Sequence, residues 1–212
     1  MRLFDYWRSS AAYRARIALN LKGLAYEQVA VDLRAGDQRG GAYLERNPQA
    51  LVPLLEDGPV RISQSLAIIE YLEERHPEPL LLPEDAAERA RARALALLIA
   101  CEIHPLNNLR VLTYLERDLG LDEERRLAWY RHWVAAGLGA LERELQDHKA
   151  AFALGERPTV VDVCLVPQMA NARRYACDLE PYPTLRVIDE HCRSVPAFAA
   201  AAPERQPDAP GT

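Results

Sequence analysis

Three short stretches in the first third of the chain place polar or conformationally restricted residues where they could bind an anion. They are Trp7-Arg8-Ser9-Ser10, Val52-Pro53 and Gln64-Ser65. A serine at the first turn of a helix offers its hydroxyl group beside unpaired backbone N–H groups, and the helix dipole favours negative charge there. Ser9, Ser10 and Ser65 each open a helical pattern, so these positions could stabilise a carboxylate or a thiolate. The chain itself shows no evident catalytic nucleophile.

The elements that position these residues are predicted to form an α/β domain over residues 1–79. We expect a strand at 3–7, a helix at 14–21 ended by Gly23, a strand at 26–33, a loop with a short helix at 34–46, a hairpin at 54–62 turning at Asp57-Gly58, and a helix at 65–75. A strand, a helix and a second strand at this spacing predict a parallel pair, and the later strands predict an antiparallel hairpin.

A Pro-rich break at residues 76–79 separates this domain from a predicted all-helical domain over residues 86–212. Helical patterns cover 86–119 with a kink or turn at Pro105, 123–145 with enough pattern for a pair of helices, 159–176 and 182–192, followed by a tail rich in Pro and Ala. Thr159 and Asp162 have the spacing of a capping box at the start of the third pattern.

Composition excludes several classes of function. The 212 residues carry a formal net charge of −5, which argues against nucleic-acid binding, and the many arginines, dispersed among acids, are expected on a solvated surface. The four cysteines have neither redox nor metal-ligand spacing, so we expect no metal and four buried thiols. With neither a signal-peptide pattern nor an apolar run of membrane-spanning length expected, the chain is predicted to be a cytoplasmic protein without a membrane partner.

Motifs along almost the whole chain resemble the zeta class of glutathione transferases. They are Arg8-Ser9-Ser10, Arg14-x-Arg16-Ile17-Ala18-Leu19, Asn47-Pro48-Gln49, Val52-Pro53, the run from Gln64-Ser65 to Leu72, Leu165-Val166-Pro167-Gln168 and Asp178-Leu179-x-Pro181-Tyr182-Pro183. The resemblance implies the glutathione transferase fold, with a thioredoxin-like N-terminal domain and an all-α C-terminal domain. It also implies a homodimer with glutathione as its cofactor.

The class includes glutathione-dependent isomerases that convert maleylacetoacetate or maleylpyruvate to the fumaryl isomer in aromatic catabolism. The chain departs from the usual pattern at Ala11, where the zeta class has cysteine. Bacterial maleylpyruvate isomerases are similar to it in lacking that thiol. They also share the motif His104-Pro105-x-Asn107-Asn108-x-Arg110 and the pair Arg173-Arg174. These features favour the maleylpyruvate branch and leave the maleylacetoacetate branch open.

By the same resemblance, glutathione would be bound through the backbone of Val52 before a cis Pro53 and through the helix start at Ser65. The other implied cofactor-binding residues are Ser10, Gln38 at the glycyl end, Gln49, Gln64, His104, Asn108 and Arg110. Taken alone, Ser65 could be a plain helix cap, and His104 could be a packing residue.

For catalysis, we expect Ser9 or Ser10 to stabilise the glutathione thiolate, with simple helix capping as the alternative for both. Arg8, Arg110 and Arg174 are candidates to bind the two carboxylates of the substrate, because guanidinium groups bind carboxylates bidentately. One residue of the Arg173-Arg174 pair is expected to face solvent or an ion pair.

Two other functions remain open from sequence. A general glutathione transferase that conjugates electrophiles would share the cofactor site but would need an apolar pocket, which the arginines argue against. A non-catalytic transferase-like module that binds a protein partner would not need the serine motifs to be intact.

Overall fold

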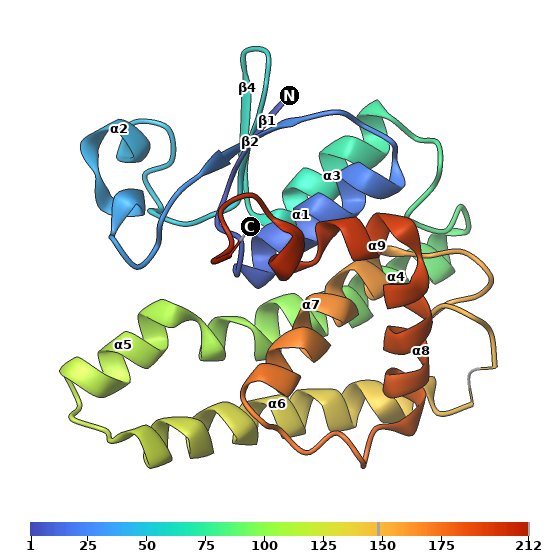
Figure 1. The fold of residues 1–212 in the computed structure, drawn as a ribbon. Coiled ribbons are helices and arrows are strands. Elements are labelled where there is room, and N and C mark those ends of the chain that lie inside the picture. The colour runs from blue at the N-terminus through green and yellow to red at the C-terminus, as the bar shows by residue number, and fades with distance from the viewer. Residues whose placement is uncertain (148, 212) are drawn as a thin grey trace. The chain divides into compact units, whose positions relative to one another are not determined.

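The computed structural model describes residues 1–147 and 149–211, and its chain divides into two units. Unit 1 combines Met1–Leu81 with the segment from Ser194 onward, and unit 2 is Leu82–Arg193 (Figure 1). The sequence-based division at 86–212 differs at the last segment, which belongs with the α/β unit. This segment returns to unit 1 because it hydrogen-bonds to the first helix, as described below.

Unit 1 is built on a four-stranded sheet in the order β2-β1-β3-β4. The strands are β1 (Arg2–Asp5), β2 (Glu27–Ala30), β3 (Leu54–Asp57) and β4 (Val60–Ser63). The predicted parallel pair is confirmed in β1 and β2, and the predicted hairpin is confirmed in β3 and β4. Gly58 has φ +57° in the hairpin turn, a backbone conformation that glycine adopts readily.

The helices of unit 1 match the predicted pattern except at two places: α1 begins at Ser10 instead of residue 14, and the C-terminus contributes a further helix. They are α1 (Ser10–Leu21), α2 (Gly41–Leu44), α3 (Ser65–Arg75) and α9 (Pro196–Ala201), with 3₁₀ turns at Asp37–Arg39 and Pro203–Arg205. Helices α1 and α3 pack together, and α2 lies apart from them (Figure 1). The segment expected to be a Pro- and Ala-rich tail contains α9, which lies along α1.

Two arginines of α1 are buried, against the expectation that the arginines are solvated. Arg14 is 2% exposed and Arg16 is fully buried. Arg16 forms a 2.6 Å ion pair with the equally buried Asp5 at the end of β1. Burial raises the pKa of Asp5, while the guanidinium of Arg16 acts in the opposite direction. A buried ion pair of this kind needs both partners, since removing one would leave an uncompensated charge.

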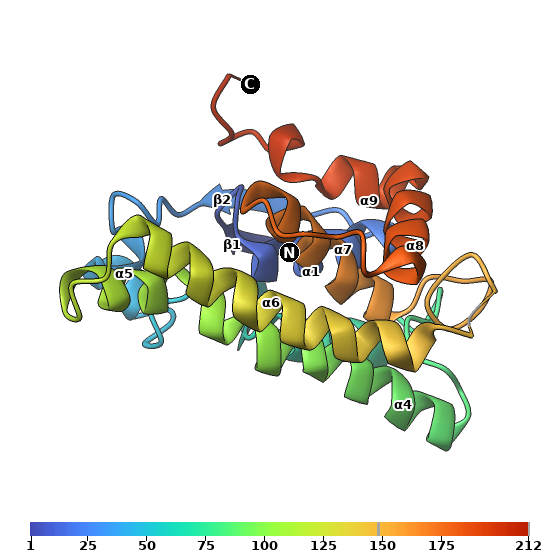
Figure 2. The ribbon, with the colours of Figure 1, turned by 90° about the horizontal axis from the view of Figure 1, so that it is seen from below.

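In the described part of unit 2, the regular elements are helices, and Phe152 and Gly155 form an isolated β-bridge. The elements of unit 2 are α4 (Ala86–Leu97), a π-helical segment (Leu98–Ile103), a 3₁₀ turn (Pro105–Asn107), α5 (Leu109–Arg117), α6 (Glu123–Leu145), α7 (Val160–Arg174) and α8 (Pro183–Ser194). The pattern over 123–145 forms one helix of 23 residues instead of a pair. Helix α6 packs against α5 and the π-helical segment, and α4 packs against α7 (Figure 2).

Local details explain how the helices of unit 2 begin and approach one another. The capping box is confirmed: the backbone N–H of Thr159 donates to Asp162, and the Thr159 hydroxyl accepts from the first turn of α7. The predicted kink at Pro105 is preceded by the π-helical segment. Gly137 permits the close approach of α6 to that segment, because a Cβ there would lie 2.2 Å from the side chain of Ile103.

Two expectations about apolar character need correction. Cys164 and Cys192 are buried as expected, but Cys101 is exposed and Cys177 is half-buried.

The helical stretch Ala86–Arg117 is long and apolar enough to cross a membrane by length and composition, although no such run was expected. One stretch of this kind is weak evidence for a membrane, because helices of helical domains reach the same composition. Over the described residues, no cluster of potential metal ligands occurs.

Candidate functional site

The first candidate site element is the turn that joins β1 to α1. Ser9 is the N-cap of α1, and its hydroxyl oxygen accepts the backbone N–H of Ala12 at 3.2 Å. Its own N–H donates to the carbonyl of Tyr6 at 2.8 Å, which closes the turn. Ser10 is the first helical residue and is buried. The two serines and the N–H groups of the first turn therefore lie together at the positive end of the helix dipole.

Arg8 lies in the same turn, directly before the cap. It is half-buried, and its guanidinium carbon lies 5.4 Å from the centre of the Trp7 ring, within the range of a cation–π contact. This contact holds the cationic head near the start of α1. The structure therefore brings Arg8, Ser9 and Ser10 into one turn, as the spacing in the sequence predicts.

The second helix start belongs to α3. Gln64 precedes it with φ +71°, and Ser65 is its first residue and is buried. The guanidinium of Arg14 in α1 donates to the Ser65 hydroxyl oxygen at 3.3 Å. Since that oxygen accepts from Arg14, the hydroxyl proton is directed to another acceptor. The sequence reasoning gave Arg14 no role, although an arginine within an apolar helical pattern was a usable signal.

The loop before β3 carries the third element. The Val52–Pro53 peptide bond is cis, as the family resemblance implies. Asn47 is buried; its side-chain amide donates to the carbonyl of Leu51 at 2.7 Å, and its oxygen accepts the N–H of Gln49 at 3.1 Å. Asn47 therefore fixes the loop that leads to Val52. The sequence reasoning noted Asn47 only as part of a motif and assigned it no function.

Three glutamines complete the candidate residues of unit 1. The side-chain amide of Gln64 donates to the side-chain oxygen of Gln49 at 2.7 Å, which joins the loop before Val52 to the start of α3. Gln38 lies in the 3₁₀ turn after β2 and is 7% exposed. Among the described residues, its side-chain oxygen has no hydrogen-bond partner. A buried amide oxygen in this state is a ready acceptor for a ligand N–H group.

The candidate residues of unit 2 have local partners. Asn108 is the N-cap of α5, and its side chain accepts the N–H of Arg110, whose side chain is exposed. His104 follows the π-helical segment and is half-buried. Arg174 is exposed; its guanidinium lies over the Tyr175 ring at 4.7 Å and donates to the Tyr175 hydroxyl.

Arg173 pairs with the buried Asp189 at 2.6 Å. The prediction that one residue of the Arg173-Arg174 pair makes an ion pair or faces solvent is confirmed, and Arg173 is the ion-paired one. Arg174 is therefore the member of the pair whose guanidinium could still serve a substrate carboxylate.

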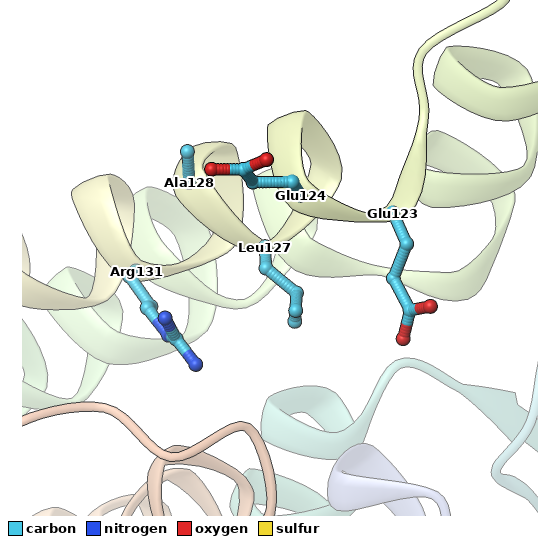
Figure 3. A pocket seen from close by; sticks show the side chains of 5 residues that line it. All are labelled: Glu123, Glu124, Leu127, Ala128 and Arg131. Atoms are coloured by element: carbon cyan, nitrogen blue, oxygen red, sulfur yellow. The ribbon is translucent and has the colours of Figure 1, made fainter.

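Unit 2 also has a surface pocket that is lined by residues other than these candidates. It has a volume of about 480 Å³ and is lined by Glu123, Glu124, Leu127, Ala128 and Arg131 of α6. Figure 3 shows Glu123, Leu127 and Arg131 projecting on the same side of the helix, as their four-residue spacing requires. This lining includes no residue that the sequence predicted for the site. With two carboxylates at its rim, it does not resemble a site for an anionic substrate.

The sheet, the cis-proline loop and the two serine-bearing helix starts define the class of protein as a glutathione transferase. Residues 1–74 match the family model described as "Glutathione S-transferase, N-terminal domain". The chain is 52% identical to the probable maleylacetoacetate isomerase of Vibrio cholerae, over 98% of this chain and 97% of that protein.

Two solved structures are similar over their full lengths. The holo structure of a maleylpyruvate isomerase, a bacterial zeta-class glutathione S-transferase, has a TM-score of 0.97 at 46% identity and covers 99% of this chain and 100% of that one. The maleylacetoacetate isomerase of Methylobacterium extorquens, with bound malonate and glutathione, has a TM-score of 0.96 at 43% identity and covers 100% of both chains. The chain belongs to the zeta class of glutathione transferases, the family of maleylacetoacetate and maleylpyruvate isomerases.

Proposed function

We propose that this protein is a glutathione-dependent isomerase that converts a maleyl keto acid to its fumaryl isomer. The observation that carries the proposal is the turn at the start of α1, where Arg8 stands beside the helix N-terminus formed by Ser9 and Ser10. This turn offers donors for a sulfur anion and a guanidinium for a carboxylate within three consecutive residues. Full-length relatives named as isomerases of both maleyl keto acids support the same reaction.

The residues of unit 1 fit glutathione, a tripeptide with two carboxylates and a thiol. The N–H groups and the hydroxyl proton of Ser65 at the start of α3 would bind the γ-glutamyl carboxylate. The backbone of Val52 would pair with the cysteinyl segment, and the partnerless buried oxygen of Gln38 would accept an N–H group near the glycyl end. The side chains of Gln49 and Gln64 are hydrogen-bonded to each other, and both would bind glutathione near its γ-glutamyl end.

When bound, glutathione supplies a thiolate that adds reversibly to the cis double bond, which permits rotation about the resulting single bond. Of the two serines, we assign the thiolate contact to Ser9. Its hydroxyl oxygen already accepts an N–H at the cap, so its proton is directed to a different acceptor. The first-turn N–H groups and the dipole of α1 would lower the pKa of a thiol held there.

The substrate carries two carboxylates, and we propose that Arg8, Arg110 and Arg174 bind them. Arg8 would also stabilise the negative charge that develops on the substrate during addition. The related isomerase that was solved with malonate and glutathione contains a dicarboxylate, which agrees with this chemistry. His104 and Asn108 would contribute to cofactor binding from unit 2.

We also propose the biological setting that the family implies. The protein would act in the cytoplasm as a homodimer, in the breakdown of an aromatic compound. Unit 1 would be the glutathione-binding domain and the helical unit the substrate-binding domain. Between the two substrates, the alanine at position 11 and the doubled arginine favour maleylpyruvate.

The direct test follows the absorbance of maleylpyruvate and of maleylacetoacetate with the purified protein, with and without glutathione. We expect rapid isomerisation that requires glutathione, and faster turnover of maleylpyruvate. Binding of glutathione without turnover of either substrate would contradict the proposal. Conjugation of a panel of apolar electrophiles would then point to a general transferase, and failure to bind glutathione-agarose would point to a non-catalytic module.

A further inference from the structure

The C-terminal tail of unit 1 returns to the turn that carries Arg8 and Ser9. Helix α9 lies along α1, where the side chain of Asn20 donates to the carbonyl of Ala197 at 3.0 Å (Figure 1). Beyond α9, the buried side chain of Gln206 donates to the carbonyls of Ala200 and Ala202, which folds the chain back. The tail is therefore fastened to the first helix before it reaches Asp208.

Asp208, near the end of the tail, binds the backbone of the turn that carries Arg8 and Ser9. One oxygen of its carboxylate accepts the N–H of Trp7 at 2.9 Å, across 201 residues of sequence. A hydrogen bond to an ionised carboxylate is stronger than one between neutral groups. Trp7, which donates this hydrogen bond, stands immediately before Arg8, so the contact fixes the entry into the turn.

Arg16 binds the backbone carbonyl group of Trp7. Its guanidinium donates to the carbonyl of Trp7 at 3.0 Å, to the Asp5 carboxylate at 2.6 Å and to the carbonyl of Ala201 at 2.9 Å. Both Arg16 and Asp5 are fully buried. One planar cation therefore joins the end of β1, the turn and the end of α9, and its fork geometry leaves little freedom in their relative positions.

We propose that Asp208 and Arg16 are positioning residues for catalysis, which clamp the N–H and the C=O of Trp7 and thereby place Arg8 and Ser9 for the reaction. The inference rests on the proposed function and adds the C-terminal tail to the machinery of that site. Catalytic groups must be held close to their productive geometry, and a displacement of 1 Å can cost about 100-fold in rate. Neither positioning residue needs to contact glutathione or the substrate.

The test compares two variants that share the loss of charge. Asp208→Asn keeps a side-chain oxygen able to accept the Trp7 N–H, whereas Asp208→Ala removes the acceptor. Asn20→Ala is the matched structural control, because it loosens α9 from α1 without touching Trp7. Each variant is assayed for kcat and KM with maleylpyruvate and for melting temperature. The thiolate of bound glutathione is titrated by its ultraviolet absorbance.

We expect Asp208→Ala to lower kcat by about 10-fold to 100-fold with a much smaller change in KM for glutathione. Both substitutions remove the negative charge of Asp208, and this change alone favours the thiolate. The effect of losing the hydrogen bond to Trp7 is therefore measured by comparing Asp208→Ala with Asp208→Asn. Relative to that variant, Asp208→Ala is expected to raise the pKa of the bound thiol. Asn20→Ala is expected to lower the melting temperature by about 2–4 °C and to leave kcat and the thiol titration unchanged.

Equal kcat values and equal thiol titrations for Asp208→Ala and Asp208→Asn would overturn the positioning role. A fall in kcat of the same size in Asn20→Ala would also overturn it, because a general loosening of the tail would then explain the effect. If the unaltered protein binds glutathione without forming a thiolate, the proposed function fails first, and the inference fails with it.

Discussion

In unit 1, Ser65 accepts from a buried arginine of another helix, and the Trp7 peptide is bound by Arg16 of α1 and by Asp208 of the C-terminal tail. In unit 2, Asn108 caps its own helix and Arg174 lies over the ring of the next residue. The first kind of site is supported by contacts between several elements, whereas the second uses contacts within one element. This difference agrees with the proposal that unit 1 binds glutathione, the cofactor common to all turnovers.

The helical unit presents exposed guanidinium groups instead. We propose that these arginines bind the substrate carboxylates, because a planar guanidinium matches the geometry of a carboxylate bidentately. Changes in unit 1 should therefore affect the rate and the cofactor, and changes at the exposed arginines of unit 2 should affect the affinity for substrate. Substitutions at the serines and arginines of both units test that division, beginning with the largest expected effect.

Ser9→Ala should cause the largest loss. Removing one preorganised donor to a developing anion typically lowers kcat by about 100-fold to 1000-fold. The measurement is kcat with maleylpyruvate together with the thiolate absorbance of bound glutathione. Ser10→Ala is the matched control, and a larger loss in that variant would assign the thiolate contact to Ser10. The cap would also be lost in Ser9→Ala, at a cost of about 1 kcal/mol in the free energy of unfolding.

Arg8→Ala should lower turnover by roughly 100-fold, by analogy with the loss of one oxyanion donor. Glutathione binding, measured by isothermal titration, should change much less, because the guanidinium is assigned to the substrate. A Kd for glutathione that rises as steeply as kcat falls would show that Arg8 belongs to the cofactor site. Unchanged turnover would remove it from the mechanism.

Ser65→Ala tests the helix start of α3. Because the lost hydroxyl would donate to a carboxylate, the Kd for glutathione should rise by about 10-fold or more, as for a hydrogen bond to a charged group. At saturating glutathione, kcat should remain close to that of the unaltered protein. A loss confined to kcat would contradict the assignment of Ser65 to the γ-glutamyl end.

Arg174→Ala and Arg173→Ala form a matched pair in unit 2. We expect Arg174→Ala to raise the KM for maleylpyruvate by about 10-fold, the cost of one charge-assisted contact. Arg173→Ala should leave KM unchanged and lower the free energy of unfolding by about 1–3 kcal/mol, because it removes a partner of the buried Asp189. The reverse outcome would exchange the roles of the two arginines.

The smallest effect concerns Glu56 of β3, which hydrogen-bonds to Arg2 and Arg46. Burial alone would raise the pKa of Glu56, but the hydrogen bonds from Arg46 and Arg2 outweigh it and lower the pKa below its ordinary value of 4.5. The charged form therefore stabilises the fold above pH 4.5, and this contribution is lost as the pH falls through the lowered pKa. Urea unfolding should show a difference between the unaltered protein and Glu56→Gln that shrinks below pH 4.5. A difference that stays constant into acid would contradict the pKa argument.

Local sequence patterns predicted much of the fold. Asp57-Gly58 between two apolar runs specified the hairpin, and Thr159 with Asp162 specified a helix start, because both signals act over a few residues. The order of strands and helices then left few topologies open. The same local signals indicated Ser9 and Ser10 as capping residues, and Ser9 is the cap of α1.

What the sequence did not disclose depends on long-range contacts. Arg16 and Asp208 look like ordinary charged residues, and only the fold shows that they meet on either side of Trp7. The pattern over 123–145 contains no Pro to separate two helices, and the capped, continuous α6 is the result. Whether Cys101 is buried could not be read from apolar neighbours, because that depends on which face of the helical stretch is covered.

We propose that glutathione is a cofactor of an isomerisation and is not consumed. The most direct measurement supplies maleylpyruvate in large excess over glutathione and follows both the fumaryl product and the free thiol in one reaction. We predict complete conversion of the substrate, with many turnovers per glutathione and no loss of thiol. Product formation that stops when it equals the glutathione supplied, with the thiol lost as a stable adduct, would contradict the claim and identify a conjugating transferase.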